Sequence, residues 1–471
     1  MKSSEFRKYG HQFVEWMADY LDQVEDYPVK SQVDPGETYK KIQNEIPSQG
    51  ESIEAIFHDF KKVILPGITH WQSPNFFAYF PANSSPPSIL AEMLTATLGV
   101  QGMKWETSPS STELEERMME WLRDTVGLPL DWSGVIQDTA SSATLVSILT
   151  AREQNTGYSI NRSGFNTDFR FRVYCSEETH SSIEKAVKIA GIGRENIVKL
   201  PVDKLMRLRP DLLRRQIEKD IATGYQPLCI IATLGTTGTT AIDPLEEIAA
   251  VATAHDIWMH VDAAYAGSAL LLPEYQKHIK GIESADSFVF NPHKWLFTNF
   301  DCSAYFVKDK NALIETFEIL PEYLRTQTEG LVANHCDWGI PMGRRFRSLK
   351  LWFVMRYYGL EELQNKLRKH IELARWLEEE IQKSARFEVA PPRNFNLVCF
   401  RFVPEAPMDL DEINAMNEKL LQLLNSSGQI YLTHTKVNGI YTLRMVIGQT
   451  RVEKHHVEAA WKLIQQKARE I

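Results

Sequence analysis

Hydrophobic and polar positions between residues 170 and 307 alternate between two patterns. Short apolar runs, typical of buried strands, are separated by longer segments in which apolar residues recur every three or four positions. The apolar runs are 171–175, 229–233, 257–261, 287–290 and 303–307, and the helical segments are 181–190, 212–222 and 244–255. This alternation predicts a largely parallel sheet that is covered by helices on both faces.

The flanking segments carry patterns of their own. Residues 3–24 place aromatic and aliphatic side chains at helical spacing, and this stripe could pack on the chain itself or on a second copy. Residues 111–127 predict a helix in which Thr112 and Glu115 form a capping box. Residues 397–471 alternate strand and helix again, which predicts a small α/β domain with an antiparallel sheet.

Polar residues follow the predicted strands at their carboxyl ends, where ligands bind in such sheets. Asp262 follows one strand, and Lys294 follows another, directly after His293. An isolated His–Lys pair is more typical of a solvated loop beside an edge strand. Together, however, an acid and a lysine at two strand ends can converge on pyridoxal 5'-phosphate. That cofactor needs a lysine amine for its Schiff base and a carboxylate to keep its pyridine nitrogen protonated.

Other polar residues extend this candidate site. His180 precedes a helix start, where a histidine is more often a capping or core residue than a catalytic one. In the cofactor hypothesis its ring covers one face of the pyridine. The remaining expected cofactor-binding residues are Ala140, Ser141 and Asn291 for the phosphate, Thr237 and Ala264 beside the ring, and His293 next to the lysine. Residues 139–142 open a helix with free N–H groups and hydroxyls, which makes a seat for an anion.

Composition narrows the class of protein. The chain has 471 residues, which predicts two or three domains, and its net charge of −9 without a long basic run argues against nucleic acid as a partner. We find no signal-like N-terminus and no apolar run long enough to span a membrane, so we expect no membrane association. The five cysteines form no CxxC motif and are expected to be reduced, in a cytoplasmic protein.

Two loops stand out. Residues 70–81 contain five aromatic residues and two prolines, and such a loop is either a domain seam or the wall of an apolar pocket. Residues 321–341 show weak periodicity and predict a long loop of the kind that often forms a lid.

Eight segments together resemble one family. They are DTASSATL, THSSIEKA, IATLGTTGTTAIDPL, HVDAAYAGSA, ADSFVFNPHKWL, NFDCSAYFV, PEYL and GRRFRSLKLWF. In this order they resemble the aromatic-L-amino-acid decarboxylases, the group II pyridoxal-phosphate-dependent decarboxylases. The resemblance implies the aspartate-aminotransferase-like fold type I, with a mostly parallel seven-stranded sheet and a small α/β C-terminal domain. It also implies a homodimer and three segments, namely an arm at 1–81, a cofactor domain at 82–345 and a small domain at 346–471.

The resemblance also implies roles for single residues. Lys294 corresponds to the Schiff-base lysine, Asp262 to the partner of the pyridine nitrogen and His180 to the histidine stacked on the ring. Tyr323, in PEYL, corresponds to the tyrosine of the mobile loop that protonates the carbanion after carbon dioxide leaves. Relatives that lack this tyrosine or histidine tend to release an aldehyde, so their retention favours plain decarboxylation.

The expected function is decarboxylation of tryptophan, tyrosine, phenylalanine or DOPA to an arylalkylamine. The residues that match the substrate pocket of the family are Trp71, Phe77, Tyr79, Phe80, Phe300 and Gly343. We expect no metal site. The alternatives are an aromatic aldehyde synthase, a decarboxylase of glutamate or histidine, and a non-catalytic cofactor binder or dimer scaffold.

Overall fold

The computed structural model describes residues 1–165, 169–319 and 332–471, and its internal contacts divide the chain into two units. The central unit comprises Ala82–Glu372 and Pro391–Leu397. The terminal unit comprises Met1–Pro81, Leu373–Ala390 and Val398–Ile471. The division into three segments at residues 81 and 345 stays a prediction.

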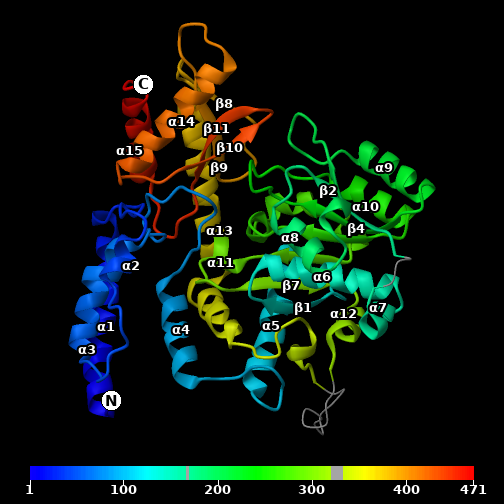
Figure 1. The fold of residues 1–471 in the computed structure, drawn as a ribbon, viewed down its shortest axis with the longest axis horizontal. Helices are drawn as coiled ribbons and strands as arrows, with labels where there is room; N and C mark the ends of the chain where they lie inside the picture. Colours follow the sequence, from blue (N-terminus) through cyan, green and yellow to red (C-terminus); the bar gives the residue numbers. More distant parts are fainter. Residues whose placement is uncertain (166–168, 320–331) are drawn as a thin grey trace. The chain divides into compact units, whose positions relative to one another are not determined.

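A seven-stranded sheet forms the middle of the central unit, in the order β1-β7-β6-β5-β4-β2-β3. The strands are β1 Ser133–Gln137, β2 Phe171–Ser176, β3 Ile197–Leu200, β4 Gln226–Thr233, β5 Trp258–Asp262, β6 Ser287–Phe290 and β7 Ser303–Val307. Strand β7 runs antiparallel to both of its neighbours, and the other neighbouring strands are parallel. The predicted mostly parallel sheet of fold type I is therefore confirmed (Figure 1).

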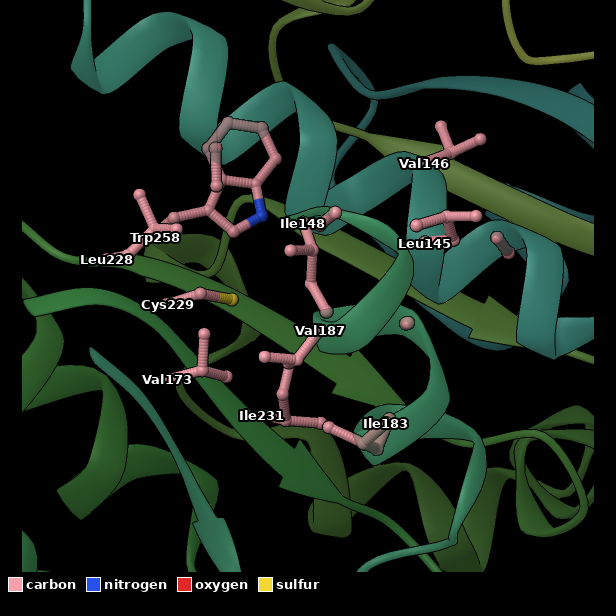
Figure 2. Packing of buried hydrophobic residues seen from close by; sticks show 14 of the residues in the cluster. Leu145, Val146, Ile148, Val173, Ile183, Val187, Leu228, Cys229, Ile231 and Trp258 are labelled. Carbon is pink, nitrogen blue, oxygen red and sulfur yellow. The ribbon is translucent and has the colours of Figure 1, made fainter. Parts of the chain in front are cut away.

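Helices cover both faces of this sheet. The helices of the central unit are α4 Pro86–Leu98, α5 Pro109–Val126, α6 Ala140–Asn155, α7 Ser159–Ser163, α8 Ser182–Ile189, α9 Pro210–Ala222, α10 Leu245–Ala254, α11 Pro292–Trp295, α12 Lys310–Phe317 and the start of α13 Arg347–Gln382. Val173 of β2 packs in a core cluster that α6 and α8 complete, as Figure 2 shows. The next residue, Tyr174, donates a hydrogen bond to Asp220 of α9 at 3.0 Å. Because successive strand residues face opposite sides, β2 is buried on both.

Helix α5 begins earlier than its capping motif suggested. The helix starts at Pro109, and Thr112 and Glu115 are buried within it. Glu115 accepts hydrogen bonds from the Ile136 N–H at 2.9 Å and from Arg344 at 2.6 Å. The predicted capping box is therefore wrong, because a buried carboxylate is better stabilised by an arginine than by its own helix terminus.

The terminal unit carries a second sheet. Its four strands lie in the order β10-β11-β9-β8, and they are β8 Phe387–Val389, β9 Leu397–Phe402, β10 Thr433–Val437 and β11 Ile440–Val446. The pairs β8–β9 and β10–β11 are antiparallel, as predicted. The helices of this unit are α1 Ser3–Gln23, α2 Glu37–Lys41, α3 Ile53–Asp59, α14 Leu410–Ser426, α15 Lys454–Lys467 and the end of α13.

The aromatic stripe of α1 is only partly covered within the terminal unit. Phe13 and Trp16 contact Phe57 of α3, with ring centroids 4.8 Å and 5.6 Å apart. Phe6 remains 64% exposed, and no residue of α1 is buried. None of the helices in the described residues is both long enough and apolar enough to cross a membrane.

Candidate active site

The acid and the amine of the candidate site stand at the ends of neighbouring strands. Asp262 is the last residue of β5, and its partner in β6 is Val289. Lys294 lies in α11, a single helical turn that replaces the loop expected after β6. Burial lowers the pKa of the Lys294 amine, and the negative charge of Asp262 opposes this shift. The two groups are therefore close enough to interact electrostatically.

The Asp262 carboxylate is fixed by the backbone that follows it. Its Oδ1 atom accepts a hydrogen bond from the Ala264 N–H at 3.0 Å. The Ala264 carbonyl accepts from the Asn291 N–H at 3.0 Å, which ties the end of β5 to the end of β6. Through Ala264 and Asn291, the loops that carry the acid and the lysine are held together.

His180 lies within electrostatic range of both groups. Its Nδ1 accepts a hydrogen bond from the Ser182 N–H at 3.2 Å, and Ser182 is the first residue of α8. Partial removal from water lowers the pKa of His180, the charge of Lys294 lowers it further, and Asp262 raises it. A neutral imidazole with its proton on Nε2 follows. Such a ring can lie against a flat ligand without adding a positive charge.

The start of α6 offers N–H groups to an anion. The Thr139 side chain caps the helix by accepting from the Ser142 N–H at 3.4 Å. Ala140 and Ser141 are the first two helical residues, and their N–H groups have no intrahelical acceptor. A helix start with free N–H groups attracts a phosphate.

Asn291 contributes a second donor near this helix start. Its Oδ1 accepts a hydrogen bond from Ser303 at 2.7 Å, which fixes the orientation of the side-chain amide. Ser303 pairs with Gln137 at the end of β1, which leads into α6. The Nδ2 group of Asn291 is thereby turned away from Ser303, where it can donate to a ligand.

The loop after β4 approaches the loop after β5. Gly235 adopts a φ of +91°, and a Cβ atom there would lie 2.5 Å from the Cβ of Ala266. Only glycine permits this approach. The exposed Thr237 follows two residues later, at the same edge of the sheet as Asp262.

His293 is buried beside the lysine. Its Nδ1 accepts a hydrogen bond from the Cys302 N–H at 2.9 Å. Burial lowers the pKa of His293 to about 3, and the charge of Lys294 adds to the shift. The neutral ring contacts Phe300 edge-on, with centroids 4.7 Å apart, and Phe300 is 58% exposed.

The residues predicted to form a substrate pocket fall into both units. Phe300 and Gly343 belong to the central unit, where a Cβ at Gly343 would lie 3.2 Å from the Nε2 atom of Gln101. The other four, Trp71, Phe77, Tyr79 and Phe80, belong to the terminal unit. Their joint role in a pocket stays a prediction, and Tyr323 lies outside the described residues.

Within the terminal unit these aromatic residues differ in their surroundings. The rings of Trp71 and Tyr79 stack with centroids 5.8 Å apart, and Tyr79 is 48% exposed. Phe77 is fully buried in the core, and its N–H donates to the Tyr431 carbonyl at 3.0 Å. Phe80 lies under the guanidinium of Arg444, 5.7 Å from its ring centroid.

Two residues at the site were not predicted from the sequence. Thr233 of β4 pairs with Asp262 in the sheet, so the two side chains share a face. Its hydroxyl is buried and has no hydrogen-bond partner among the described residues. Asn83 donates from Nδ2 to the Lys294 carbonyl at 2.9 Å. The polar end of an apolar run was a signal for Thr233, whereas nothing in the sequence marked Asn83.

These residues fit pyridoxal 5'-phosphate. The donors of α6 and Asn291 suit a phosphate, the enclosed Lys294 amine suits an aldehyde, and Asp262 suits a pyridinium nitrogen. The unpartnered Thr233 hydroxyl beside Asp262 is the independent sign that a polar group binds there, since a buried hydroxyl rarely stays unpaired. Groups of histidine, cysteine and acidic residues that could hold a metal ion do not occur in the ranges that the structure describes.

Comparison with known proteins agrees with this chemistry. The model of the pyridoxal-dependent decarboxylase conserved domain matches residues 35–403. Tryptophan decarboxylase 2 of Oryza sativa subsp. japonica is 42% identical over 481 residues, covering 100% of this chain and 96% of that protein. Phenylacetaldehyde synthase of Arabidopsis thaliana is 44% identical over 479 residues, covering 99% of this chain and 96% of that protein.

Solved structures show the same similarity. The crystal structure of Catharanthus roseus tryptophan decarboxylase in complex with L-tryptophan aligns with a TM-score of 0.94 and 41% identity, covering 100% of this chain and 99% of that one. The family model spans most of the chain, and the first relatives match it from end to end. The chain therefore belongs to the group II pyridoxal-dependent decarboxylases, the aromatic-L-amino-acid decarboxylase family, and is a carboxy-lyase that uses pyridoxal 5'-phosphate.

Proposed function

We propose that this enzyme decarboxylates aromatic L-amino acids, namely tryptophan, tyrosine, phenylalanine or DOPA, to arylalkylamines and carbon dioxide. The observation that carries the proposal is that Asp262, Lys294 and His180 lie at or just after the carboxyl ends of the parallel strands β5, β6 and β2, at one edge of the sheet. Support for an aromatic substrate comes from relatives named tryptophan decarboxylase and tyrosine decarboxylase, which match at 42% and 44% identity.

Each residue has a distinct task in this proposal. When bound, the cofactor supplies an electron sink for the bond that breaks when carbon dioxide leaves. Lys294 holds and releases the ligand, and its lowered pKa increases the fraction of amine that is unprotonated and nucleophilic. Asp262 offers a negative charge to a pyridinium, and the neutral His180 covers a ring face and excludes water.

In this proposal, the residues that match the substrate pocket of the family select the aromatic side chain. Trp71 and Tyr79 already stack on each other and present partly exposed ring surface, which favours flat apolar ligands over carboxylates. Gly343 leaves space where any side chain would press on Gln101. Glutamate or histidine is a weaker alternative substrate, since aromatic side chains dominate this set of residues.

A second candidate is an aromatic aldehyde synthase, favoured by the 44% identity with phenylacetaldehyde synthase. That reaction converts an amino acid, oxygen and water to an aldehyde, carbon dioxide, ammonia and hydrogen peroxide. This chain retains His180 and Tyr323, the two residues that the family resemblance associates with amine formation. We therefore favour the decarboxylase.

One experiment tests both candidates. Purified protein with added cofactor is incubated with each aromatic amino acid and with glutamate and histidine, and amine, aldehyde and peroxide are measured together. We expect amine in excess with at least one aromatic substrate and little peroxide. Aldehyde and peroxide in equal amounts would identify the synthase, and turnover of glutamate or histidine alone would overturn the aromatic proposal.

We also propose that the enzyme is a homodimer. Helix α4 presents a row of apolar side chains to solvent at helical spacing: Leu90, Met93, Leu94 and Leu98 are 38–61% exposed. Uncovered apolar rows of this kind are typical of interfaces between copies of a chain. We propose a cytoplasmic location as well, which the five buried thiols favour.

Sedimentation of the wild type and of Leu94→Asp tests the dimer. We expect a dimer for the wild type and a shift toward monomer for the variant, because a carboxylate on an apolar interface is costly to desolvate. Leu130→Asp, at an exposed leucine outside α4, serves as the control. A monomeric wild type, or an unshifted Leu94→Asp variant, would contradict the proposed interface.

A further inference from the structure

Five buried side chains of the central unit are connected by hydrogen bonds into one network. The Trp258 Nε1–H donates to Ser147 Oγ at 2.9 Å, and the hydroxyls of Ser147 and Ser287 are 2.8 Å apart. Ser287 Oγ lies 2.8 Å from Nδ1 of His260, and Nε2 of His260 lies 3.3 Å from Thr144 Oγ1. We call these five residues the His260 network. All of them are buried.

The hydrogen bonds of the network match a neutral histidine. His260 is fully buried, and this burial lowers its pKa to about 4. A neutral imidazole has one N–H donor and one acceptor nitrogen. Each nitrogen faces one hydroxyl, and a hydroxyl can either donate or accept. His260 can therefore be satisfied at both nitrogens without carrying a charge.

The network joins the three elements that carry the cofactor residues. His260 precedes Asp262 by two positions on β5, so both side chains lie on the same face of the sheet. Thr144 lies one turn inside α6, whose first N–H groups form the anion seat. Ser287 opens β6, the strand that leads to Lys294.

We propose that His260 is a positioning residue that sets the Asp262 carboxylate against the pyridine nitrogen of the cofactor by tying β5 to α6 and β6. The bonds of pyridoxal 5'-phosphate fix the separation between its phosphate and its ring nitrogen. The anion seat on α6 and the acid on β5 must therefore be held at a matching separation. His260 spans these two elements directly, through Thr144.

The position of Asp262 depends on its strand. The only hydrogen bond of its carboxylate to the described residues is the one from the Ala264 N–H, so a small shift of β5 would move the carboxylate. The uncharged state of His260 matters as well. A histidine cation two positions away would attract the Asp262 carboxylate and compete with a pyridinium for its charge.

The test compares two ligands that differ only at the ring nitrogen. Dissociation constants of the full-length apoprotein are measured for pyridoxal 5'-phosphate and for its 1-deaza analogue, in which a C–H group replaces the ring nitrogen. The ratio of the two affinities reports the interaction with Asp262. Contacts to the phosphate and to the aldehyde cancel in this ratio, so a general loss of packing leaves it unchanged.

We expect His260→Leu to reduce this ratio about fivefold, the loss typical of one hydrogen bond. Thr144→Val, which keeps the side-chain volume, should reduce the ratio in the same direction. His260→Gln should restore part of it, because its amide can again donate toward Thr144. Tyr174→Phe removes a buried hydrogen bond from the same sheet outside the network and should leave the ratio unchanged.

A ratio equal to that of the wild type in both His260→Leu and Thr144→Val would overturn the proposal, even if both ligands bound more weakly. If His260→Leu fails to fold, Thr144→Val decides alone. An equal fall of the ratio in Tyr174→Phe would also overturn it, since the effect would then be general.

Discussion

The covalent chemistry of this enzyme depends on one amine, that of Lys294, and the protein lowers the pKa of this amine by burying it. Burial disfavours the charged form of Lys294, whereas Asp262 favours it, and the net effect on its pKa is a decrease. Desolvation therefore outweighs the attraction of the acid. The acid in turn accepts a hydrogen bond from the Ala264 N–H.

The first prediction concerns this lysine. Lys294→Ala should lower turnover at least about 1,000-fold, because no other amine replaces the nucleophile. Borohydride reduction followed by mass spectrometry should no longer fix the cofactor to the protein. Lys294→Arg is the matched control, since it keeps the charge but cannot form the covalent bond. Full turnover in either variant would contradict the assignment.

The second prediction concerns the tyrosine that the family resemblance singles out. Tyr323→Phe should divert product from amine toward aldehyde and peroxide, because the resemblance assigns to this hydroxyl the proton that quenches the carbanion. Amine and peroxide are measured in the same reaction. Tyr357→Phe, at a position that is 73% exposed, should leave the product ratio unchanged. An unaltered amine yield in Tyr323→Phe would show that another group delivers the proton.

At the scale of elements, the sequence was informative where an element is long and apolar. The strands at β2, β4, β5, β6 and β7 followed from their hydrophobic runs, because both of their faces are buried. Strand β3, Ile197–Leu200, was missed because it has four residues and only Leu200 is buried. The turn of α11 was expected to be a loop, since four residues are too few for a periodicity to show.

The site residues that could be predicted from the sequence were those whose chemical type points to one cofactor. Lys294 and Asp262 were found because their types and their places after strands are specific to one cofactor. Thr233 and Asn83 were missed because their significance lies in pairings between distant segments, which no local pattern records. Glu115 was assigned to its own helix terminus, although the structure pairs it with Arg344, far along the chain.

The third prediction belongs to helix α5. Glu115→Ala should lower the free energy of unfolding by about 3–5 kcal/mol, because it leaves the guanidinium of Arg344 buried without its partner. Urea denaturation followed by circular dichroism measures this change. Glu120→Ala, which removes an exposed ion pair with Arg117 from the same helix, should change stability by less than about 1 kcal/mol. Equal effects of the two substitutions would contradict the importance of burial.

For the whole molecule, buried titratable groups determine how stability depends on pH. Burial lowers the pKa of His260 and His335 to about 4 and that of His293 to about 3. The unfolded chain binds protons at these histidines near pH 6.5 and the folded chain does not, so stability falls as pH falls below 6.5. Burial raises the pKa of Asp243 and Asp286 to about 6, which opposes this trend.

The sizes of these pKa shifts determine whether the histidines or the aspartates have the larger effect on stability. Between pH 7 and pH 5.5, each histidine removes about 1.2 kcal/mol of stability and each aspartate adds about 0.8 kcal/mol. With three histidines and two aspartates, these five groups together should lower the free energy of unfolding by about 2 kcal/mol over this interval. The free energy of unfolding from urea titrations at the two pH values measures the difference.

His335→Phe isolates one histidine, since both of its ring nitrogens lack hydrogen-bond partners among the described residues and its ring packs edge-on against Trp338. Because it removes one titrating group and keeps the ring, this variant should lose about 1.2 kcal/mol less than the wild type on acidification. An identical acid sensitivity in the variant would show that His335 is not held neutral in the folded protein.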